Sequence, residues 1–114
     1  MSVQTIETMA RWVEANVTES PTLQDMSSYV GYSPYYCSAK FREHMGMTYK
    51  QFLSQCRIRA AASDLSTTND KIIEIAFRYG YSSSEAFARA FSQTFHCPPR
   101  RYRESCTVHS GQPR

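Results

Sequence analysis

The sequence predicts an all-α protein in which one two-helix unit occurs twice. Apolar residues recur at steps of three and four along nearly all of the 114 residues, which is the spacing of one helix face. Capping residues and glycines divide this pattern into segments of helical length. A set of residues then repeats after 49 or 50 positions, while clean period-two alternation, the mark of strands, does not occur.

The first half is expected to hold three helices, followed by the longest candidate helix of the chain. The first helix is amphipathic, and Thr22 is a candidate cap for the second, which Gly31 ends in a left-handed turn. Ser33 followed by Pro34 is a typical helix start, and Gly46 ends that third helix. The residues that define the faces of the first and fourth helices are Ile6, Met9, Val13 and Val17, and Phe52, Ile58, Ala61 and Leu65.

In the second half, a short helix around Ile75 is closed by Gly80, and serines 82–84 cap a helix that ends before Pro98-Pro99. A final short turn holds Tyr102, and residues 105–114 are expected to form a disordered polar tail. The expected helices span about residues 6–17, 23–30, 33–45, 48–65, 72–79 and 83–95.

The repeat joins equivalent positions of the two halves. At an offset of 49, Leu23, Met26, Ser27, Val30, Gly31, Tyr32 and Ser33 match Ile72, Ile75, Ala76, Tyr79, Gly80, Tyr81 and Ser82. After one extra residue, Cys37, Phe41, Met45 and Phe52 match Phe87, Phe91, Phe95 and Tyr102. The repeated unit is a short helix, a glycine turn and a capped second helix, which is the helix-turn-helix arrangement. The expected organisation is a first unit over 5–47, a linker helix over 48–66 and a second unit over 67–104.

The composition is that of a soluble globular protein, with 41% hydrophobic and 20% charged residues. No run approaches the roughly 20 apolar residues that a bilayer span requires, and no signal peptide is visible, so a cytoplasmic location is expected. The four cysteines are therefore interpreted as reduced thiols. Residues 31–60 and 91–114 carry net charges of +4 and +3, whereas 1–30 and 61–90 carry −3 and −1. Such a polarised surface suits a polyanion.

The second helix of a helix-turn-helix enters the major groove of DNA, so its outward face is the candidate reading surface. In the first copy, Cys37, Phe41 and His44 are expected on the buried side, and in the second copy Phe87, Phe91 and Phe95. In the first copy the outward residues are Tyr35, Ala39 and Arg42, flanked by Ser38, Tyr36 and Glu43. In the second copy they are Glu85, Arg89 and Ser92, flanked by Ala86 and Ala88. Arginine can bind guanine bidentately, glutamate can accept from cytosine, and alanine can pack on a thymine methyl.

The linker helix suggests how two units can share one duplex. About 17 residues at the helical rise span roughly 25 Å. Successive major-groove segments on one face of DNA repeat every ~34 Å, so a monomer is expected to occupy adjacent segments. Because the two candidate reading helices differ in sequence, the expected site is asymmetric and about two helical turns long.

Two segments of the second half resemble the signature of the AraC/XylS family of transcription regulators. The first runs from Ile72 to Phe91 and includes Ile75-Ala76, Gly80-Tyr81 and Phe87–Phe91, and the second runs from Pro98 to Arg103. The segment Arg57 to Leu65 is similar to the linker helix of that family. The resemblance covers about residues 5–104, and the size is similar to stand-alone members of the MarA/SoxS type.

This resemblance implies seven helices, sequence-specific binding of duplex DNA near promoters, usually as an activator, and RNA polymerase as a protein partner. By position, it implies base reading by Tyr35, Ser38 and Ala39, and by Ser84, Glu85, Ala88 and Arg89. Phosphate contacts are expected from Ser33, Tyr36, Lys40, Ser83, Arg100 and Arg101. The chain departs from the family at Ala39-Lys40, where an arginine followed by an apolar residue is common.

Other functions have less support in the sequence. His96, Cys97, Cys106 and His109 match no common zinc spacing, so no metal is expected. No paired carboxylates, phosphate loop or catalytic triad emerges, so neither an enzyme nor a cofactor is expected. Most of the eight tyrosines, Tyr29 among them, fall at core or turn positions, and Tyr35 and Tyr36 are exceptions. Stacking on single strands is therefore a minor alternative. A protein-binding adaptor that touches DNA weakly remains open, and the Ala39 departure favours it.

Overall fold

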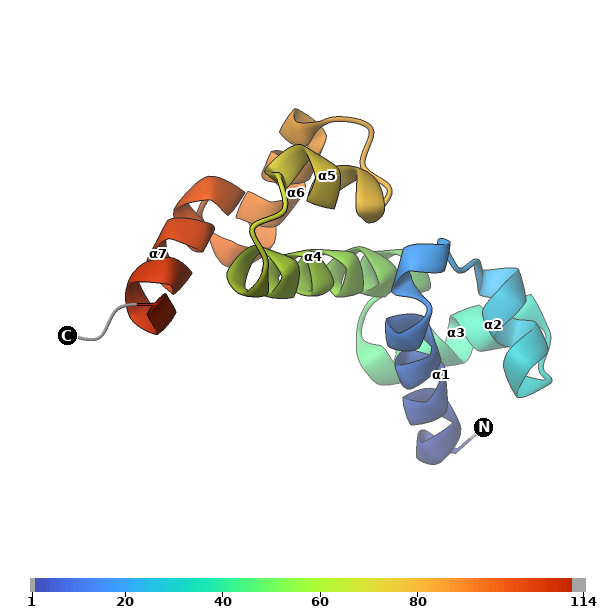
Figure 1. The fold of residues 1–114 in the computed structure, drawn as a ribbon. Helices are drawn as coiled ribbons and strands as arrows, with labels where there is room; N and C mark the ends of the chain where they lie inside the picture. Colours follow the sequence, from blue (N-terminus) through green and yellow to red (C-terminus); the bar gives the residue numbers. More distant parts are fainter. Residues whose placement is uncertain (1, 112–114) are drawn as a thin grey trace. The chain divides into compact units, whose positions relative to one another are not determined.

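The computed structural model describes residues 2–111, with side chains described as far as residue 106, and within that range it contains helices and no strand (Figure 1). The helices are α1 (Val3–Ala15), the short 3-10 helix η1 (Val17–Glu19), α2 (Leu23–Val30), α3 (Pro34–Met45), α4 (Tyr49–Thr67), α5 (Ile72–Arg78), α6 (Ser84–Phe95) and α7 (Pro99–Gly111). The described part of the chain thus holds seven α-helices, which confirms the all-α class.

The chain divides into two compact units, Met1–Cys56 and Arg57–Arg114. The division falls inside α4, the continuous green helix of Figure 1. The first turns of α4 therefore belong to the first unit and its last turns to the second, where the sequence suggested a linker helix that belonged to neither.

The core of the first unit lies among α1, α2, α3 and the start of α4. Phe41 is fully buried and packs edge-on against Phe52 and Tyr49, with ring centroids 5.3 and 6.2 Å away. The Tyr49 hydroxyl donates to the Pro21 carbonyl oxygen at 2.6 Å, which fixes the start of α2 against α4. The buried residues of this core are Ile6, Met9, Val13, Met26, Cys37, Phe41, Tyr49, Phe52, Leu53 and Cys56.

The expected start and stop residues of α2 and α3 are confirmed. Thr22 Oγ1 accepts from the Asp25 N–H while Asp25 Oδ2 accepts from the Thr22 N–H, a capping box that satisfies two free donors at the helix start. Gly31 and Gly46 adopt φ values of 85° and 73° after α2 and α3. An added Cβ meets nothing within 4 Å at either glycine, so only the left-handed backbone favours glycine there.

The second unit is built from the end of α4 with α5, α6 and α7. Phe91 is fully buried at the centre of an aromatic cluster, with Phe87, Phe95 and Tyr102 at centroid distances of 5.7, 4.7 and 5.3 Å. The buried residues are Ile58, Ala61, Ala62, Leu65, Ile75, Ala76, Tyr79, Phe87, Phe91 and Pro99. Gly80, at φ 87°, ends the α5 segment as Gly31 ends α2.

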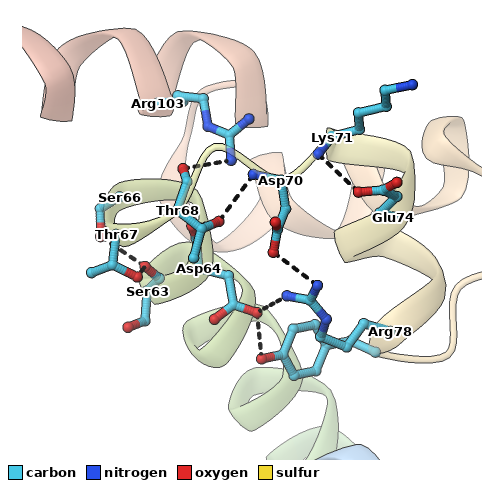
Figure 2. Close-up of polar contacts among 11 residues, drawn as sticks. Ser63, Asp64, Ser66, Thr67, Thr68, Asp70, Lys71, Glu74, Arg78 and Arg103 are labelled. Atoms are coloured by element: carbon cyan, nitrogen blue, oxygen red, sulfur yellow. Dashed lines mark hydrogen bonds and ion pairs between the residues drawn. The ribbon is translucent and has the colours of Figure 1, made fainter.

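A polar network surrounds the turn between α4 and α5 (Figure 2). The Arg78 guanidinium donates to Asp64 at 2.7 Å and to Asp70 at 2.9 Å, and the Tyr79 hydroxyl donates to Asp64 at 2.8 Å. The hydrogen bonds to Asp70 and Asp64 raise the pKa of Arg78, and burial followed by the Asp64 hydrogen bond raises the pKa of Tyr79 to about 12. Arg103 of α7 donates to the carbonyl oxygens of Leu65 and Thr68, at 3.0 and 3.2 Å, which caps the C-terminal end of α4.

Three expectations from the sequence need correction. The final short turn is a helix of 13 residues, α7, and it continues to Gly111 through most of the segment expected to be disordered. Tyr102 and Arg103 anchor the first turns of α7, and extension of a helix from an anchored start costs little. Residues 112–114 of the expected tail lie outside the described residues.

The second correction is His44, which is exposed, because the buried stripe of α3 advances by steps of four through Cys37 and Phe41 to the half-buried Met45. The third is Tyr29, which is 61% exposed although it stacks on Trp12 with a centroid distance of 5.9 Å. Within the described residues, no helix has both the length and the apolar character that crossing a membrane requires.

Candidate nucleic-acid interface

Helix α3 presents its candidate reading row to solvent. Ser33 Oγ accepts from the Tyr36 N–H at 3.2 Å, and Pro34 occupies the first helical position, so the start of α3 is well defined. Cys37 and Phe41 are fully buried, which determines the direction in which the opposite face points. The residues of that outward row, Tyr35, Ser38, Ala39 and Arg42, are all exposed.

Helix α6 is built in the same way. Ser83 Oγ accepts from the Ala86 N–H at 3.1 Å, and Phe87 and Phe91 are fully buried on the inward face. On the outward side, Glu85 and Arg89 are exposed. The shorter side chains beside them, Ser84, Ala88 and Ser92, are half-buried.

The two outward rows are in register. Both helices have 12 residues, and their caps are Ser33 and Ser83, an offset of 50. The extra residue of the second copy therefore precedes the cap, and Ser33 matches Ser83 and not Ser82. The same offset pairs Tyr35, Ser38, Ala39 and Arg42 with Glu85, Ala88, Arg89 and Ser92. Each row occupies helix positions i, i+3, i+4 and i+7, so its members lie along one face. These rows contain the sequence-predicted reading residues except Ser84, and the row of α6 also holds Ser92, which was not predicted to read bases.

Several predicted phosphate residues have local partners. Lys40 Nζ lies 3.3 Å from Glu43 Oε2 and 5.8 Å from the centre of the Tyr36 ring. Ser33 and Ser83 use their oxygens as helix caps, but each hydroxyl proton can still be donated to an anion. Arg100 is largely exposed and lies 3.9 Å from Glu104, a distance too long for a strong ion pair.

The arginines on these surfaces are largely uncommitted. Among the side chains that the structure describes, no ion pair involves Arg42, Arg89 or Arg101. Arg89 and Glu85 lie one helical turn apart on α6, yet they do not pair with each other. Both charges therefore remain available to an external ligand.

A shallow groove of about 250 Å³ opens beside the first two turns of α6. It brings three candidate base-reading residues of α6 next to Arg100, a candidate phosphate residue at the start of α7. The groove is lined by Ile72, Ser84, Glu85, Ala88, Pro98, Pro99 and Arg100. The surface of the second unit that carries the predicted reading residues is thus hollowed rather than flat.

The cysteines and histidines form no metal centre in the part of the chain that is described. No group of three or more His, Cys, Asp or Glu side chains there is placed to hold a metal ion. The side chain of His109, one of the candidate ligands, lies outside the described residues. Cys37 and Cys56 are buried as expected, and desolvation raises the pKa of the Cys37 thiol, which lowers its reactivity.

The sequence gives no signal for the residues that hold α5 and α7 against the end of α4. Asp64 lies in no motif, although it binds both Arg78 and Tyr79. Arg103 belongs to a motif of the sequence, and its contacts with Leu65 and Thr68 show a structural role. These pairs are 14 to 38 residues apart in the chain, so no local pattern could have revealed them.

The chain contains two helix pairs, and in each pair a glycine turn leads to a capped second helix with a solvent-facing row. This arrangement defines a tandem helix-turn-helix protein.

A family model described as a helix-turn-helix domain matches residues 26–105. The HTH-type transcriptional activator AarP of Providencia stuartii is 34% identical over 96 residues, which are 84% of this chain and 71% of AarP. An uncharacterized HTH-type transcriptional regulator of Staphylococcus aureus is 38% identical over 92 residues, 81% of this chain. The chain spans only 12% of the length of that staphylococcal relative.

Solved structures share the fold. An AraC-type DNA-binding domain-containing regulator from Chromobacterium violaceum superposes with a TM-score of 0.86 at 24% identity, covering 90% of this chain and 92% of that one. The DNA-binding domain of AdpA, solved in complex with a target DNA, has a TM-score of 0.80 at 21% identity, covering 95% and 97%. The chain belongs to the AraC-type helix-turn-helix family of transcription regulators.

Proposed function

We propose that this chain is a sequence-specific, duplex DNA-binding transcription regulator, acting as an activator, that places α3 and α6 in major-groove segments. The observation that carries this proposal is the pair of matched outward rows. Each lies on a capped helix whose opposite face is buried, and each holds an exposed arginine that makes no ion pair among the described side chains. In a helix-turn-helix, the second helix is the one that enters the groove.

The comparisons support the class of ligand and the direction of regulation. The DNA-binding domain of AdpA, which shares the fold, binds a target DNA. AarP, which is 34% identical to this chain over 96 residues, is a transcriptional activator. An activator has to engage the transcription machinery, so RNA polymerase is the proposed protein partner. This role places the protein in the cytoplasm, associated with the nucleoid.

The residues divide into two roles. Tyr35, Ser38, Ala39 and Arg42 of α3, and Ser84, Glu85, Ala88 and Arg89 of α6, are proposed to contact base edges, which carry the sequence information. Ser33, Tyr36, Lys40, Ser83, Arg100 and Arg101 are proposed to contact phosphates, which position the protein without specifying sequence. The two rows differ in chemistry, so a monomer on an asymmetric site of about two helical turns is the proposed complex.

The test is selection of binding sites from a random duplex library, with purified protein at one near-physiological salt concentration. We expect an asymmetric motif with two conserved segments about one helical turn apart. Fixed salt is essential because phosphate contact alone gives salt-dependent binding without sequence preference. A single short motif would mean that only one unit reads sequence.

A protein-binding adaptor is the second candidate, and the outer face of α5 favours it. Ile73 and Phe77 lie one turn apart on that helix and are 45% and 55% exposed. Apolar side chains of this size in solvent are typical of contact surfaces. Selection that returns no enriched sequence would overturn the proposed DNA reader and leave the adaptor.

A further inference from the structure

The outward rows of α3 and α6 offer different chemistry at equivalent positions. At the first three positions, α3 presents Tyr35, Ser38 and Ala39, none of which is charged. At the same positions, α6 presents Glu85, Ala88 and Arg89, two of which carry opposite charges. At these three positions the two helices therefore present different groups to base edges, although their backbones are built alike.

Tyr35 is the most exposed large apolar side chain of the described residues, with 85% of its surface in solvent. No ring pair found among the described side chains includes it, whereas its neighbours Tyr32 and Tyr36 pack together at 5.3 Å. Ala39 lies one helical turn further along the same face and is also exposed. Residues at i and i+4 have Cβ atoms about 5–6 Å apart, so the phenol ring and the methyl group form one small apolar surface.

The charges near this surface are either paired or lie beyond it. Lys40 Nζ lies 3.3 Å from Glu43 Oε2 and close to the face of the Tyr36 ring. Arg42 belongs to the same row but lies nearly one turn beyond Ala39. The first two turns of α3, which enter a groove deepest, are thus apolar or hydroxylic on their outward side.

We propose that α3 reads thymine C5-methyl groups through Tyr35 and Ala39, and that α6 reads guanine and cytosine through Arg89 and Glu85. The methyl of thymine is the apolar group that a base pair presents in the major groove, and alanine and aromatic side chains pack against it. Arginine and glutamate match the acceptors of guanine and the amino group of cytosine. The assignment rests on the proposed function, because it requires both helices to lie in major-groove segments.

The experiment replaces thymines of the selected site one at a time by deoxyuridine, which removes the methyl and leaves base pairing unchanged. Affinities are measured by fluorescence anisotropy at fixed salt, for the unaltered protein and for Tyr35→Ser. We expect one or two thymines at which deoxyuridine weakens binding about fourfold, the effect of one buried methyl. At one of these positions the deoxyuridine effect should disappear in Tyr35→Ser, because the ring that packs on that methyl is gone. An effect that depends on Ala39 should remain in this variant.

Glu85→Ser is the matched control, since it removes the side chain at the equivalent position of α6. The deoxyuridine effects should persist in this variant, while its preference for cytosine at one position is lost. Both substituted residues are exposed, so circular dichroism should show both variants folded as the unaltered protein is.

The outcomes separate this inference from the function on which it rests. Absence of any sequence preference would overturn the DNA-reading function itself. A clear preference without a favoured thymine, or with deoxyuridine effects that all persist in Tyr35→Ser, would overturn methyl reading by Tyr35 and leave the DNA-reading function standing. If the deoxyuridine effects persist in Tyr35→Ser, the methyls would act through the deformability of DNA rather than through contact with Tyr35.

Discussion

Arg89 illustrates how one residue can be tested as a reader of sequence. It is exposed on the outward row of α6, and it takes part in no ion pair among the described side chains. We expect Arg89→Ala to lose about 1–3 kcal/mol of binding on the selected site and to relax the preference at one base pair. Competition binding against single-base variants of the site measures both effects.

Arg101→Ala is the control for Arg89, because Arg101 is exposed near the start of α7 and is a proposed phosphate contact. This variant should weaken binding to all sequences alike and reduce the slope of log K against log salt by about 1. If Arg89→Ala behaved in the same way, Arg89 would be a phosphate contact and not a base reader.

His96 has a left-handed backbone that costs a residue with a side chain free energy of folding, and Gly46, the equivalent residue of the first unit, avoids that cost. Gly46 ends α3 at φ 73°, and His96 ends α6 at φ 62°, in the left-handed region that costs a residue with a Cβ roughly 1–2 kcal/mol. Glycine loses more backbone entropy on folding, which offsets part of the gain. We expect His96→Gly to raise the free energy of unfolding by about 0.5–1 kcal/mol, measured by urea denaturation.

The reciprocal variant, Gly46→Ala, should lower the free energy of unfolding by about 1 kcal/mol. An added Cβ at Gly46 meets nothing within 4 Å, so the loss would come from the backbone conformation and not from a clash. A destabilised His96→Gly would show that the imidazole contributes more than the left-handed backbone costs.

At the scale of elements, the two units stabilise equivalent helices by different means. Tyr29 of α2 and Arg78 of α5 occupy matching repeat positions, and each contacts the preceding long helix of its own unit. Tyr29 stacks on Trp12 of α1 at 5.9 Å, whereas Arg78 forms an ion pair with Asp64 of α4 at 2.7 Å. The helix-turn-helix of the second unit therefore depends on a polar network, shown in Figure 2, where the first depends on an aromatic stack.

Two carboxylates of this network should differ in their contribution to stability. Asp64 accepts from both Arg78 and the Tyr79 hydroxyl, and Tyr79 is only 6% exposed. Asp64→Ala leaves this buried hydroxyl without its acceptor and should cost about 1–3 kcal/mol in urea denaturation. Asp70→Ala removes only a pair whose side chains are 37% and 40% exposed, and should cost no more than about 1 kcal/mol.

Equal losses in the two aspartate variants would contradict this division of roles. Asp64→Asn keeps an oxygen that can accept from Tyr79, so its loss should be smaller than that of Asp64→Ala. The comparison separates the hydrogen bond of Tyr79 from the ion pair of Arg78.

At the scale of the whole molecule, the two units can be followed separately. Trp12 is the single tryptophan of the chain and lies in the first unit, so its fluorescence reports on that unit. Phe91→Ala in the second unit should cost about 3–5 kcal/mol, because the side chain is fully buried among three aromatic rings. We expect the transition seen by circular dichroism to broaden or shift while the Trp12 transition moves less. Equal shifts of both signals would mean that the chain unfolds as one cooperative unit.

The sequence by itself determined the helical class, the position of most helices and the repeat. Local physical causes produce these features: apolar spacing defines a buried face, Thr22 and Ser33 satisfy free N–H groups, and Gly31 and Gly46 permit a left-handed turn. The row of each candidate reading helix followed from the same logic, because a helix with a known buried face has a known opposite face.

Only the tertiary structure decided the length of α7, the exposure of His44 and the partners of Asp64 and Arg103. The length of α7 and the partners of Asp64 and Arg103 depend on contacts between residues that are distant in the chain. The exposure of His44 depends on whether the buried stripe of α3 continues to His44 or to Met45. A helix anchored by Tyr102 and Arg103 extends further than its own propensity indicates. A charged side chain is either paired within its unit or free for a ligand, and its neighbours in space decide which. The order of residues along the chain does not specify those neighbours.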